Sequence, residues 1–436
     1  MEMNLKVKTK GKLVEKKSLE LEELEPASPN SEYFLSEVAT TYILSIFELE
    51  IPIDSSHMYD FFNGVFLDTH PRFSCIPIEG KKGKKMWKKV EVNVKDHIIK
   101  APILPENLSP ESYLDEYMSK LATLQMQLNK PLWEVHIFNY PTNNSASTLF
   151  VKFHHAIADG VSLMGVVFAC FRRVDDPTLP LAFPTKTATS RTIIKQNVFH
   201  NFVVKTLRTV PRFLSSILCS VYDFGQTLSV VFFEDERTPI RSGNTNMRLP
   251  GSARICSITL PLIDIKRIKS LLRVTVNDVV LGIISFGIRL YIKEKEQGQT
   301  KKNTRMTASI AVNFRSIKGY AKPEDMRKGK TWGNKISVIE LILPKFKEDD
   351  FKNPLNFIMK ANKIMKRKRT SVGAIYLTAW TLEAIRIFAG YKIYISRRLL
   401  LMRNPPTPYL HVLLPYGNRS RGITPRLGCG QSPSRV

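Results

Sequence analysis

Hydrophobic and polar residues follow two different periods in the first half of the chain. Residues 109–128 place apolar side chains at spacings of three and four, which predicts an amphipathic helix with Ser109 as its N-cap. Residues 132–138 and 148–153 are short apolar runs separated by a polar turn, and they predict a β-hairpin. Helical spacing returns after Gly160. The pattern therefore predicts strand, turn and helix in succession, an arrangement that often presents a functional residue on a rigid support.

The second half of the chain mixes the same two periods. Apolar spacing predicts a helix at 265–272, and residues 275–278 resemble a capping box that opens another helix running through Tyr291. Residues 306–312 and 335–343 predict strands. No repeat of fixed period is visible, so the order of elements predicts a mixed α/β fold.

Charge and composition narrow the range of partners. The chain has 65 Lys and Arg against 39 Asp and Glu, and the net charge of +26 favours polyanions such as nucleic acid, acidic lipid head groups or phosphate-bearing cofactors. No helix-turn-helix, zinc finger or aromatic RNP-like strand accompanies the charge, so no nucleic-acid partner is expected. The five cysteines are dispersed without a CxxC pair, which excludes a zinc ribbon or a disulfide scaffold and is typical of a reducing compartment.

Hydrophobic stretches bear on membrane association. No window reaches the roughly 18 consecutive apolar residues of a spanning helix, so a membrane role would be peripheral. Residues 193–233 interleave large apolar residues with Lys and Arg, a pattern typical of basic amphipathic helices. Two interpretations of this stretch stay open: contact with an anionic membrane, or packing between two parts of the protein.

The stretch HHAIADG at 154–160 is the most informative for chemistry. If strand alternation continues to its end, His154 shares a face with Lys152, whereas His155 lies on the opposite, apolar face. An imidazole accepts a proton readily near neutral pH. His155 is therefore the candidate general base for a hydroxyl that attacks an acyl carbonyl.

Asp159 and Gly160 have expected roles in the turn that follows. Asp159 is expected to fix the turn as part of a buried ion pair, because an unpaired buried carboxylate is costly. Gly160 is expected either to let strand and helix pack closely or to supply a positive φ. The pattern alone also fits a pair of histidines that serve only as hydrogen-bonded scaffold. A metal site is disfavoured, since no further cluster of His, Cys or Glu lies nearby in the sequence.

These residues together resemble a known family. HHAIADG is similar to the HHxxxDG signature of the CoA-dependent acyltransferase superfamily, and Lys130 to Glu134 look like the PLW element of the plant-type bifunctional wax ester synthase/diacylglycerol acyltransferases. Further matches follow the family's order: residues 24–29, 275–282, 312–315 and 332–334. The resemblance covers roughly residues 24 to 385.

The resemblance implies a fold and a reaction. The fold is α/β with two lobes of the chloramphenicol acetyltransferase type, joined by a crossover and separated by a tunnel that acyl-CoA and alcohol enter from opposite sides. The reaction is O-acyl transfer of a long-chain acyl group from acyl-CoA to a fatty alcohol or to diacylglycerol. No bound cofactor or metal is implied, because acyl-CoA is a co-substrate. The implied location is the cytosolic face of the endoplasmic reticulum membrane, with peripheral attachment, and also the plasma membrane.

The resemblance also carries over site residues. The implied catalytic set is His155, His154, Asp159 and Gly160. The implied substrate-binding residues are Asn277, Asp278 and Trp133. Two of these have plain alternatives, since Asn277 can serve only to cap a helix and Trp133 can be a core residue.

The composition and the resemblance together divide the chain into five parts. These are a disordered charged leader (1–25), an N-terminal lobe (26–176), a linker with a basic amphipathic crossover (177–250), a C-terminal lobe (251–388) and a poorly ordered basic tail (389–436). Residues 386–436 hold nine Lys and Arg and no acidic residue, and the family's Asn-Val-x-Gly-Pro element is not found there. This composition indicates an altered reading frame or an abnormal splice junction. An incomplete second lobe makes a non-catalytic acyl-CoA- or lipid-binding relative the alternative function.

Overall fold

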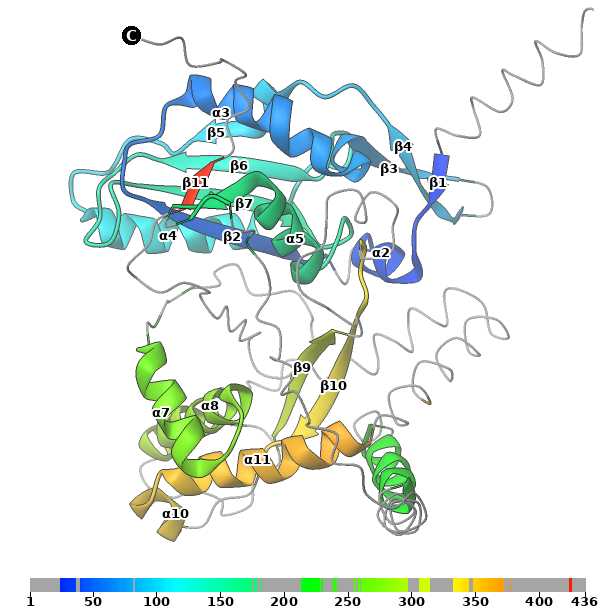
Figure 1. Ribbon diagram of the computed structural model, residues 1–436, viewed down its shortest axis with the longest axis vertical. Coiled ribbons are helices and arrows are strands. Elements are labelled where there is room, and N and C mark those ends of the chain that lie inside the picture. The colour runs from blue at the N-terminus through cyan, green and yellow to red at the C-terminus, as the bar shows by residue number, and fades with distance from the viewer. Residues whose placement is uncertain are drawn as a thin grey trace, which may run out of the picture.

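The structure is a computed structural model and shows two lobes, one above the other in Figure 1. It describes residues 24–36, 40–80, 83–174, 176–178, 181, 213–227, 229, 238–240, 255, 258, 260–296, 306–313, 332–344, 348–371, 377 and 423–425. Residues 1–23 of the predicted leader, most of the predicted crossover and most of the predicted tail lie outside these ranges. Mixed sheets with helices packed beside them confirm the predicted two-lobed α/β fold.

The first lobe is built on a four-stranded mixed sheet in the order β2-β7-β6-β5. Its strands are β2 (Tyr42–Leu49), β5 (Ile98–Lys100), β6 (Trp133–Phe138) and β7 (Ser147–His154). Only the β5–β6 pair is parallel. The helices are α2 (Pro29–Phe34), α3 (Ser55–Phe61), α4 (Pro110–Thr123) and α5 (Gly160–Cys170). The antiparallel pairing of β6 with β7 confirms the predicted hairpin.

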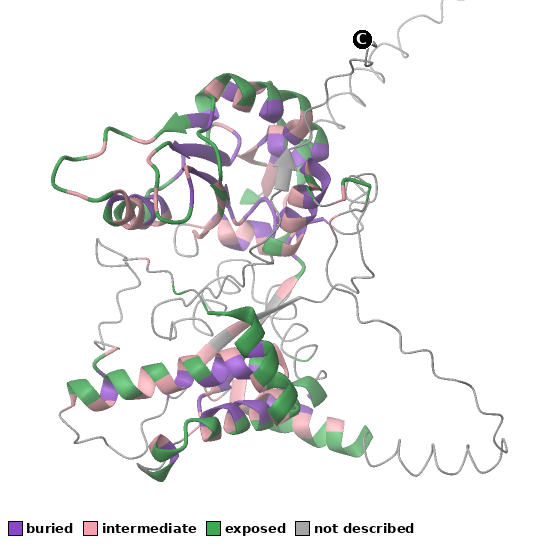
Figure 2. Cartoon of the chain, turned by 60° about the vertical axis from the view of Figure 1, so that its left-hand side comes forward, coloured by how far each residue is buried: buried purple, intermediate pink, exposed green. Residues whose placement is uncertain are grey.

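Smaller elements complete the first lobe. A three-stranded sheet has the order β1-β4-β3, with β1 (Leu24–Pro26), β3 (Cys75–Glu79) and β4 (Lys85–Lys89). Short helical turns are η1 (Phe62–Phe66), η2 (Leu67–Thr69), η3 (Pro71–Ser74) and η5 (Val94–His97). Leu24 and Glu25, the last two residues of the predicted leader, belong to β1. Buried residues, purple in Figure 2, gather around the large sheet.

One predicted helix ends earlier than expected. Ser109 caps α4 as predicted, because its side chain accepts a hydrogen bond from the backbone N–H of Ser112. The helix ends at Thr123, however, and Leu124 has extended backbone angles. Leu124 and Leu128, which extended the apolar pattern, are both exposed, so no burial stabilises a longer helix.

The second lobe packs helices against a pair of antiparallel strands. Its described elements are α7 (Leu262–Leu272), α8 (Val276–Lys295), β9 (Thr307–Asn313), β10 (Ile336–Ile342), α10 (Glu348–Lys352) and α11 (Leu355–Thr370). A helix over residues 213–227 also belongs here and is the unlabelled green helix at the lower right of Figure 1. Gly282 lets α8 and α11 approach closely, because a Cβ atom at this position would lie 2.7 Å from the Cα atom of Ile358.

The remaining pairing joins distant parts of the chain. β8 (Phe171–Arg173) pairs antiparallel with β11 (Ile423–Pro425), which are the described residues of the predicted tail. Within the described ranges no single helix has the length and apolar character to cross a membrane. Helices α7 and α8 pass that test only as a pair, and they are bent by 103° relative to each other.

Candidate active site

The HHAIADG stretch forms the turn between β7 and α5 in the first lobe. His154 is the last residue of β7, and Asp159 is the N-cap of α5. The carboxylate of Asp159 accepts a hydrogen bond of 3.0 Å from the backbone N–H of Ser162, which satisfies one of the free donors at the start of the helix. Strand and helix therefore hold the five residues between them, 155–159, in a fixed turn.

His154 lies inside the protein and is neutral. Its ring is 1% exposed, and its Nδ1 atom accepts a hydrogen bond of 3.1 Å from the backbone N–H of Ala156. Burial, together with the nearby His155 and Lys152, lowers the pKa of His154 to about 4. His154 and Lys152 both contact the ring of Tyr42, which confirms that they share a face of the sheet. The first histidine thus shapes the turn from inside the lobe.

His155 is half-buried and is held by a residue from the second lobe. The amide nitrogen of Asn334 donates to the carbonyl oxygens of His155 (2.7 Å) and Ala156 (3.4 Å), so its amide oxygen faces the imidazole. That oxygen lies 3.1 Å from Nδ1 of His155. Because an amide oxygen can only accept, Nδ1 carries the proton. In the neutral ring Nε2 is then the proton acceptor, as a general base requires.

A second contact fixes the plane of this imidazole. The ring of Phe34, at the end of α2, stacks on His155 with centroids 4.1 Å apart and planes inclined by 21°. The backbone N–H of His155 donates to the carbonyl oxygen of Thr41 over 2.9 Å. Ring plane, tautomer and backbone are therefore all constrained.

Asn334 lies in the segment 332–335, and each of these four residues contacts the first lobe. Trp332 stacks on His70 at 3.8 Å, and the carbonyl oxygen of Gly333 accepts from the hydroxyl of Ser162 over 3.1 Å. The backbone N–H of Lys335 donates to the carboxylate of Asp159 over 2.8 Å. Gly333 has a φ of 103°, which a residue with a side chain rarely adopts. The two lobes thus meet at the HHAIADG turn.

Asp159 does more than the sequence predicted for it. One carboxylate oxygen caps α5, and the other accepts the Lys335 N–H from the second lobe. The side chain is 1% exposed. Asp159 therefore fixes the turn through hydrogen bonds from backbone groups of both lobes, and the expected ion pair stays a prediction.

The two roles expected for Gly160 are both wrong. A Cβ atom at this position would meet no atom within 4 Å, and positive φ among the described glycines occurs only at Gly83 and Gly333. Gly160 is exposed at the first position of α5. The structure shows open space beside the turn at this residue.

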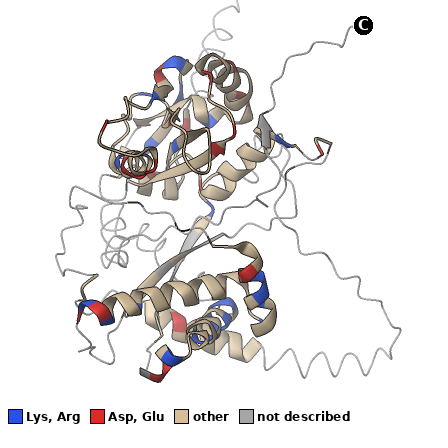
Figure 3. Ribbon diagram, turned by 90° about the vertical axis from the view of Figure 1, so that its left-hand side faces the viewer, with Lys and Arg blue, Asp and Glu red and all other residues tan. Residues whose placement is uncertain are grey.

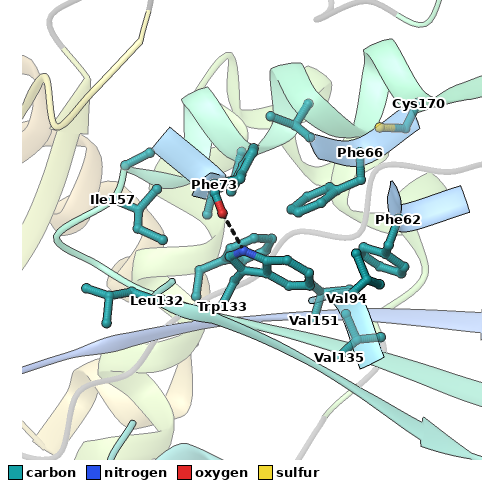
Figure 4. Packing of buried hydrophobic residues seen from close by; sticks show 14 of the residues in the cluster. Phe62, Phe66, Phe73, Val94, Leu132, Trp133, Val135, Val151, Ile157 and Cys170 are labelled. Atoms are coloured by element: carbon teal, nitrogen blue, oxygen red, sulfur yellow. Dashed lines mark hydrogen bonds between the residues drawn. The ribbon is translucent and has the colours of Figure 1, made fainter. Parts of the chain in front are cut away.

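Trp133 lies in the core of the first lobe. Its side chain is 0% exposed, and its indole N–H donates to the carbonyl oxygen of Phe73 over 2.9 Å, as Figure 4 shows. The ring stacks on Phe62 and His97. These contacts agree with the core interpretation and surround the indole with protein atoms.

Asn277 and Asp278 lie at the start of α8, in the second lobe. The predicted capping box is confirmed, since Thr275 and Asp278 exchange hydrogen bonds between side chain and backbone. The Asp278 carboxylate also accepts from Asn362 (2.7 Å) and Arg369 (2.8 Å) of α11. Asn277 is exposed. Asp278 thus joins α8 to α11 and makes no contact with His155.

Asn334 was not assigned a role from the sequence. The only signal was its place in Trp332-Gly333-Asn334, one of the elements that carry the family resemblance. The contact spans 179 positions, and neither spacing nor periodicity predicts contacts over such a distance. Among the described residues no group of three or more His, Cys, Asp or Glu side chains is arranged to hold a metal ion.

Family models match both parts of this site. The wax ester synthase/diacylglycerol acyltransferase catalytic domain matches residues 67–280, and the WS/DGAT C-terminal domain matches residues 332–404. Wax ester synthase/diacylglycerol acyltransferase 6 of Arabidopsis thaliana is 30% identical over 390 residues, which are 81% of this chain and 74% of the relative. Wax ester synthase/diacylglycerol acyltransferase 5 of the same plant is 30% identical over 403 residues, which are 86% of this chain and 78% of the relative. The chain belongs to the wax ester synthase/diacylglycerol acyltransferase family.

Solved structures of similar shape include a wax ester synthase/diacylglycerol acyltransferase from Marinobacter aquaeolei VT8. It has a TM-score of 0.48 and 17% identity and covers 85% of this chain and 78% of its own. The TRI3 trichothecene 15-O-acetyltransferase from Fusarium sporotrichioides has a TM-score of 0.48, 15% identity and coverages of 86% and 77%.

The two matched regions each contribute one residue to the His155–Asn334 pair. His155 lies in the catalytic-domain match, and Asn334 is the third residue of the C-terminal match. The C-terminal match runs to residue 404 and so extends past the lobe boundary predicted at residue 388.

Proposed function

We propose that this protein transfers a long-chain acyl group from acyl-CoA to the hydroxyl of a lipid alcohol, with His155 as the general base. The observation that carries the proposal is the Asn334–His155 pair, which holds the proton on Nδ1 and leaves Nε2 as the acceptor. The chain's membership of the wax ester synthase/diacylglycerol acyltransferase family supports acyl-CoA as the donor.

The reaction follows from this arrangement. Nε2 of His155 takes the hydroxyl proton as the alcohol oxygen bonds to the thioester carbonyl carbon. The carbon–sulfur bond then breaks, and the CoA sulfur takes the proton back from the imidazolium. The products are an ester and free CoA, and no acyl-enzyme forms. Stacking on Phe34 and the bond to Asn334 hold the ring through both proton transfers, so reorientation adds nothing to the barrier.

The acceptor is a fatty alcohol, which gives a wax ester, or diacylglycerol, which gives triacylglycerol. Both names occur together in the relatives' titles. The non-catalytic alternative has no observation in its favour, because the residues around His155 are assembled in the form that base catalysis requires.

The decisive experiment replaces the base. Purified His155→Ala, supplied with radiolabelled acyl-CoA and each acceptor in separate assays, should form no ester above background. The matched control is His57→Ala, which makes the same change at an exposed histidine of α3 and should keep full activity. Ester formation by His155→Ala at the control rate would refute the role of His155.

We also propose that the protein acts at a membrane surface, attached peripherally to the cytosolic face of the endoplasmic reticulum and also found at the plasma membrane. The proposed substrates support this, since long-chain alcohols and diacylglycerol partition into bilayers. Fractionation of cells that express the full chain tests it. Recovery in the soluble fraction alone would contradict it.

A further inference from the structure

The helix over residues 213–227 carries its apolar side chains on the outside. Leu218 is 71% exposed, Phe213 is 65% exposed and Val221 is 62% exposed. The exposed apolar face comprises Phe213, Leu214, Ile217, Leu218, Val221 and Tyr222. These positions follow helical spacing and form one continuous stripe. Surface helices of globular proteins place such a stripe toward the core. In this helix the apolar stripe faces solvent instead.

The opposite face of the same helix is polar and buried against α11. Asp223 is 1% exposed and forms ion pairs with Lys368 (3.0 Å) and Arg367 (3.2 Å). The hydroxyl of Ser216 donates to the carbonyl oxygen of Thr370 over 2.7 Å, and Ser371 donates to Asp223. These contacts fix the rotation of the helix. The outward direction of the apolar stripe is therefore set by the buried polar face.

The stripe itself carries no charged side chain, and the exposed charges of the helix beside it are positive. Asp223 is the single charged residue between positions 213 and 227, and it is buried. The neighbouring helix α11 adds exposed Lys363 and Lys366, whereas its exposed Arg369 is paired with the buried Asp278. Figure 3 shows Lys and Arg, in blue, together with Asp and Glu, in red, on the helices of this lobe. The surface is thus an apolar stripe without acidic groups, beside a helix with exposed cations.

We propose that the apolar face of the 213–227 helix docks on a lipid bilayer with anionic head groups. Apolar side chains enter the boundary between head groups and acyl chains, while the cations of α11 face the negative surface. A second copy of the chain fits less well, because two molecules with a net charge of +26 repel each other. The inference rests on the membrane association proposed above and names the surface responsible.

The test is flotation of the full-length protein with vesicles of phosphatidylcholine, with and without phosphatidylserine. The test variant combines Leu214→Gln, Leu218→Gln and Val221→Gln. These changes remove apolar area from exposed positions, so the thermal unfolding midpoint should not fall. Binding to the mixed vesicles should weaken by about tenfold or more. Acyl transfer to detergent-dispersed alcohol should stay at the wild-type rate.

Two control variants separate this surface from others. Ile103→Gln makes the same kind of change at an 88% exposed residue of the first lobe and should not alter vesicle binding. Leu271→Gln changes a 74% exposed residue of α7 in the second lobe and should also bind as wild type. Loss of binding by Leu271→Gln with retention by the triple variant would assign docking to α7 and overturn the proposal.

The remaining outcomes distinguish a failure of the docking surface from a failure of the proposed acyl transfer. Wild-type protein that binds both vesicle types equally would overturn the anionic part of the inference. A wild type that floats with neither vesicle, or that dimerises through this stripe, would overturn the docking surface and leave acyl transfer standing. Binding by the wild type that the triple variant retains would overturn the surface alone. Weaker wild-type binding at high salt is the expected result.

Discussion

Two helices of this protein have an aspartate from a family element near their first turn, and the two carboxylates have different roles: Asp159 is the N-cap of α5, and Asp278 is the third residue of α8. Asp159 caps α5 and also accepts the Lys335 N–H, so it links the lobes beside His155. Asp278 closes the capping box of α8 and binds Asn362 and Arg369, so it links two helices within one lobe. Two aspartates near the start of a helix therefore serve the site in one case and the scaffold in the other.

The comparison shows what decides whether a motif residue belongs to the site. Both carboxylates are buried, and both are satisfied by hydrogen bonds, as buried carboxylates must be. The two carboxylates differ in the residues that donate hydrogen bonds to them from other parts of the chain. The partner of Asp159 belongs to the segment that carries Asn334, whereas the partners of Asp278 belong to α11. Variants near Asp159 should therefore affect activity, and variants near Asp278 should affect stability.

The largest effect is expected at Asn334. Asn334→Ala removes the acceptor that keeps the proton on Nδ1 of His155, so turnover should fall by about 100-fold at every pH. Asn334→Asp instead places a carboxylate beside the ring and favours the imidazolium. Its pH–rate profile should therefore have an acidic limb shifted to higher pH than in wild type. A purely structural role for Asn334 predicts a pH–rate profile of unchanged shape in Asn334→Asp.

A smaller effect is expected at Asp159. Asp159→Asn keeps the size of the side chain but turns one acceptor into a donor, which then faces a backbone N–H of Ser162 or Lys335. Turnover should fall by about tenfold, and stability should fall by about 1–2 kcal/mol. Steady-state assays and urea unfolding measure the two quantities. Full activity with full stability would show that neither hydrogen bond positions the turn.

At Asp278, which joins α8 to α11, we expect a substitution to lower stability and leave activity unchanged. Burial acts to raise the pKa of Asp278, but hydrogen bonds from Thr275 and Asn362 and the charge of Arg369 together lower it. The lowered pKa stabilises the fold above about pH 4 and loses this effect as the pH falls through the folded-state value.

Asp278→Asn should therefore cost about 2 kcal/mol near neutral pH and make unfolding less sensitive to acid. Its turnover, measured well below the unfolding midpoint, should stay within about twofold of wild type. Arg369→Met is the paired variant and should cost less, because the arginine side chain is 47% exposed. A loss of turnover as large as that of Asp159→Asn would return Asp278 to the site.

The sequence predicted what local patterns control and missed what long-range contact controls. The Ser109 cap, the hairpin before His154 and the Thr275–Asp278 capping box depend on a few adjacent residues, and all three are confirmed. Gly160 was assigned a conformational role that the backbone does not require, because glycine at a helix start has several explanations. Asn334 needed the packing of two lobes, which one sequence does not encode in its spacing.

The smallest expected effect on turnover concerns His154, and it appears as a pH dependence of stability. Its pKa is lowered to about 4 in the folded protein, against about 6.5 when unfolded, so the unfolded chain binds more protons between these values. Stability contributed by neutral His154 is therefore present above about pH 6.5 and is lost as the pH falls toward 4. Between about pH 7.5 and 5.5 this loss amounts to about 1 kcal/mol.

His154→Asn can still accept the Ala156 N–H but does not titrate, so it should remove that part of the acid sensitivity. The comparison uses the slope of unfolding free energy against pH, from urea titrations of wild type and variant. A change in unfolding free energy that is the same at every pH, such as the cost of the smaller side chain, does not affect this slope. Equal slopes would mean that His154 is protonated to the same extent in both states, which contradicts its burial beside Tyr42 and Lys152. A reduced slope with turnover close to wild type would show that, of the two adjacent histidines, only His155 takes part in proton transfer.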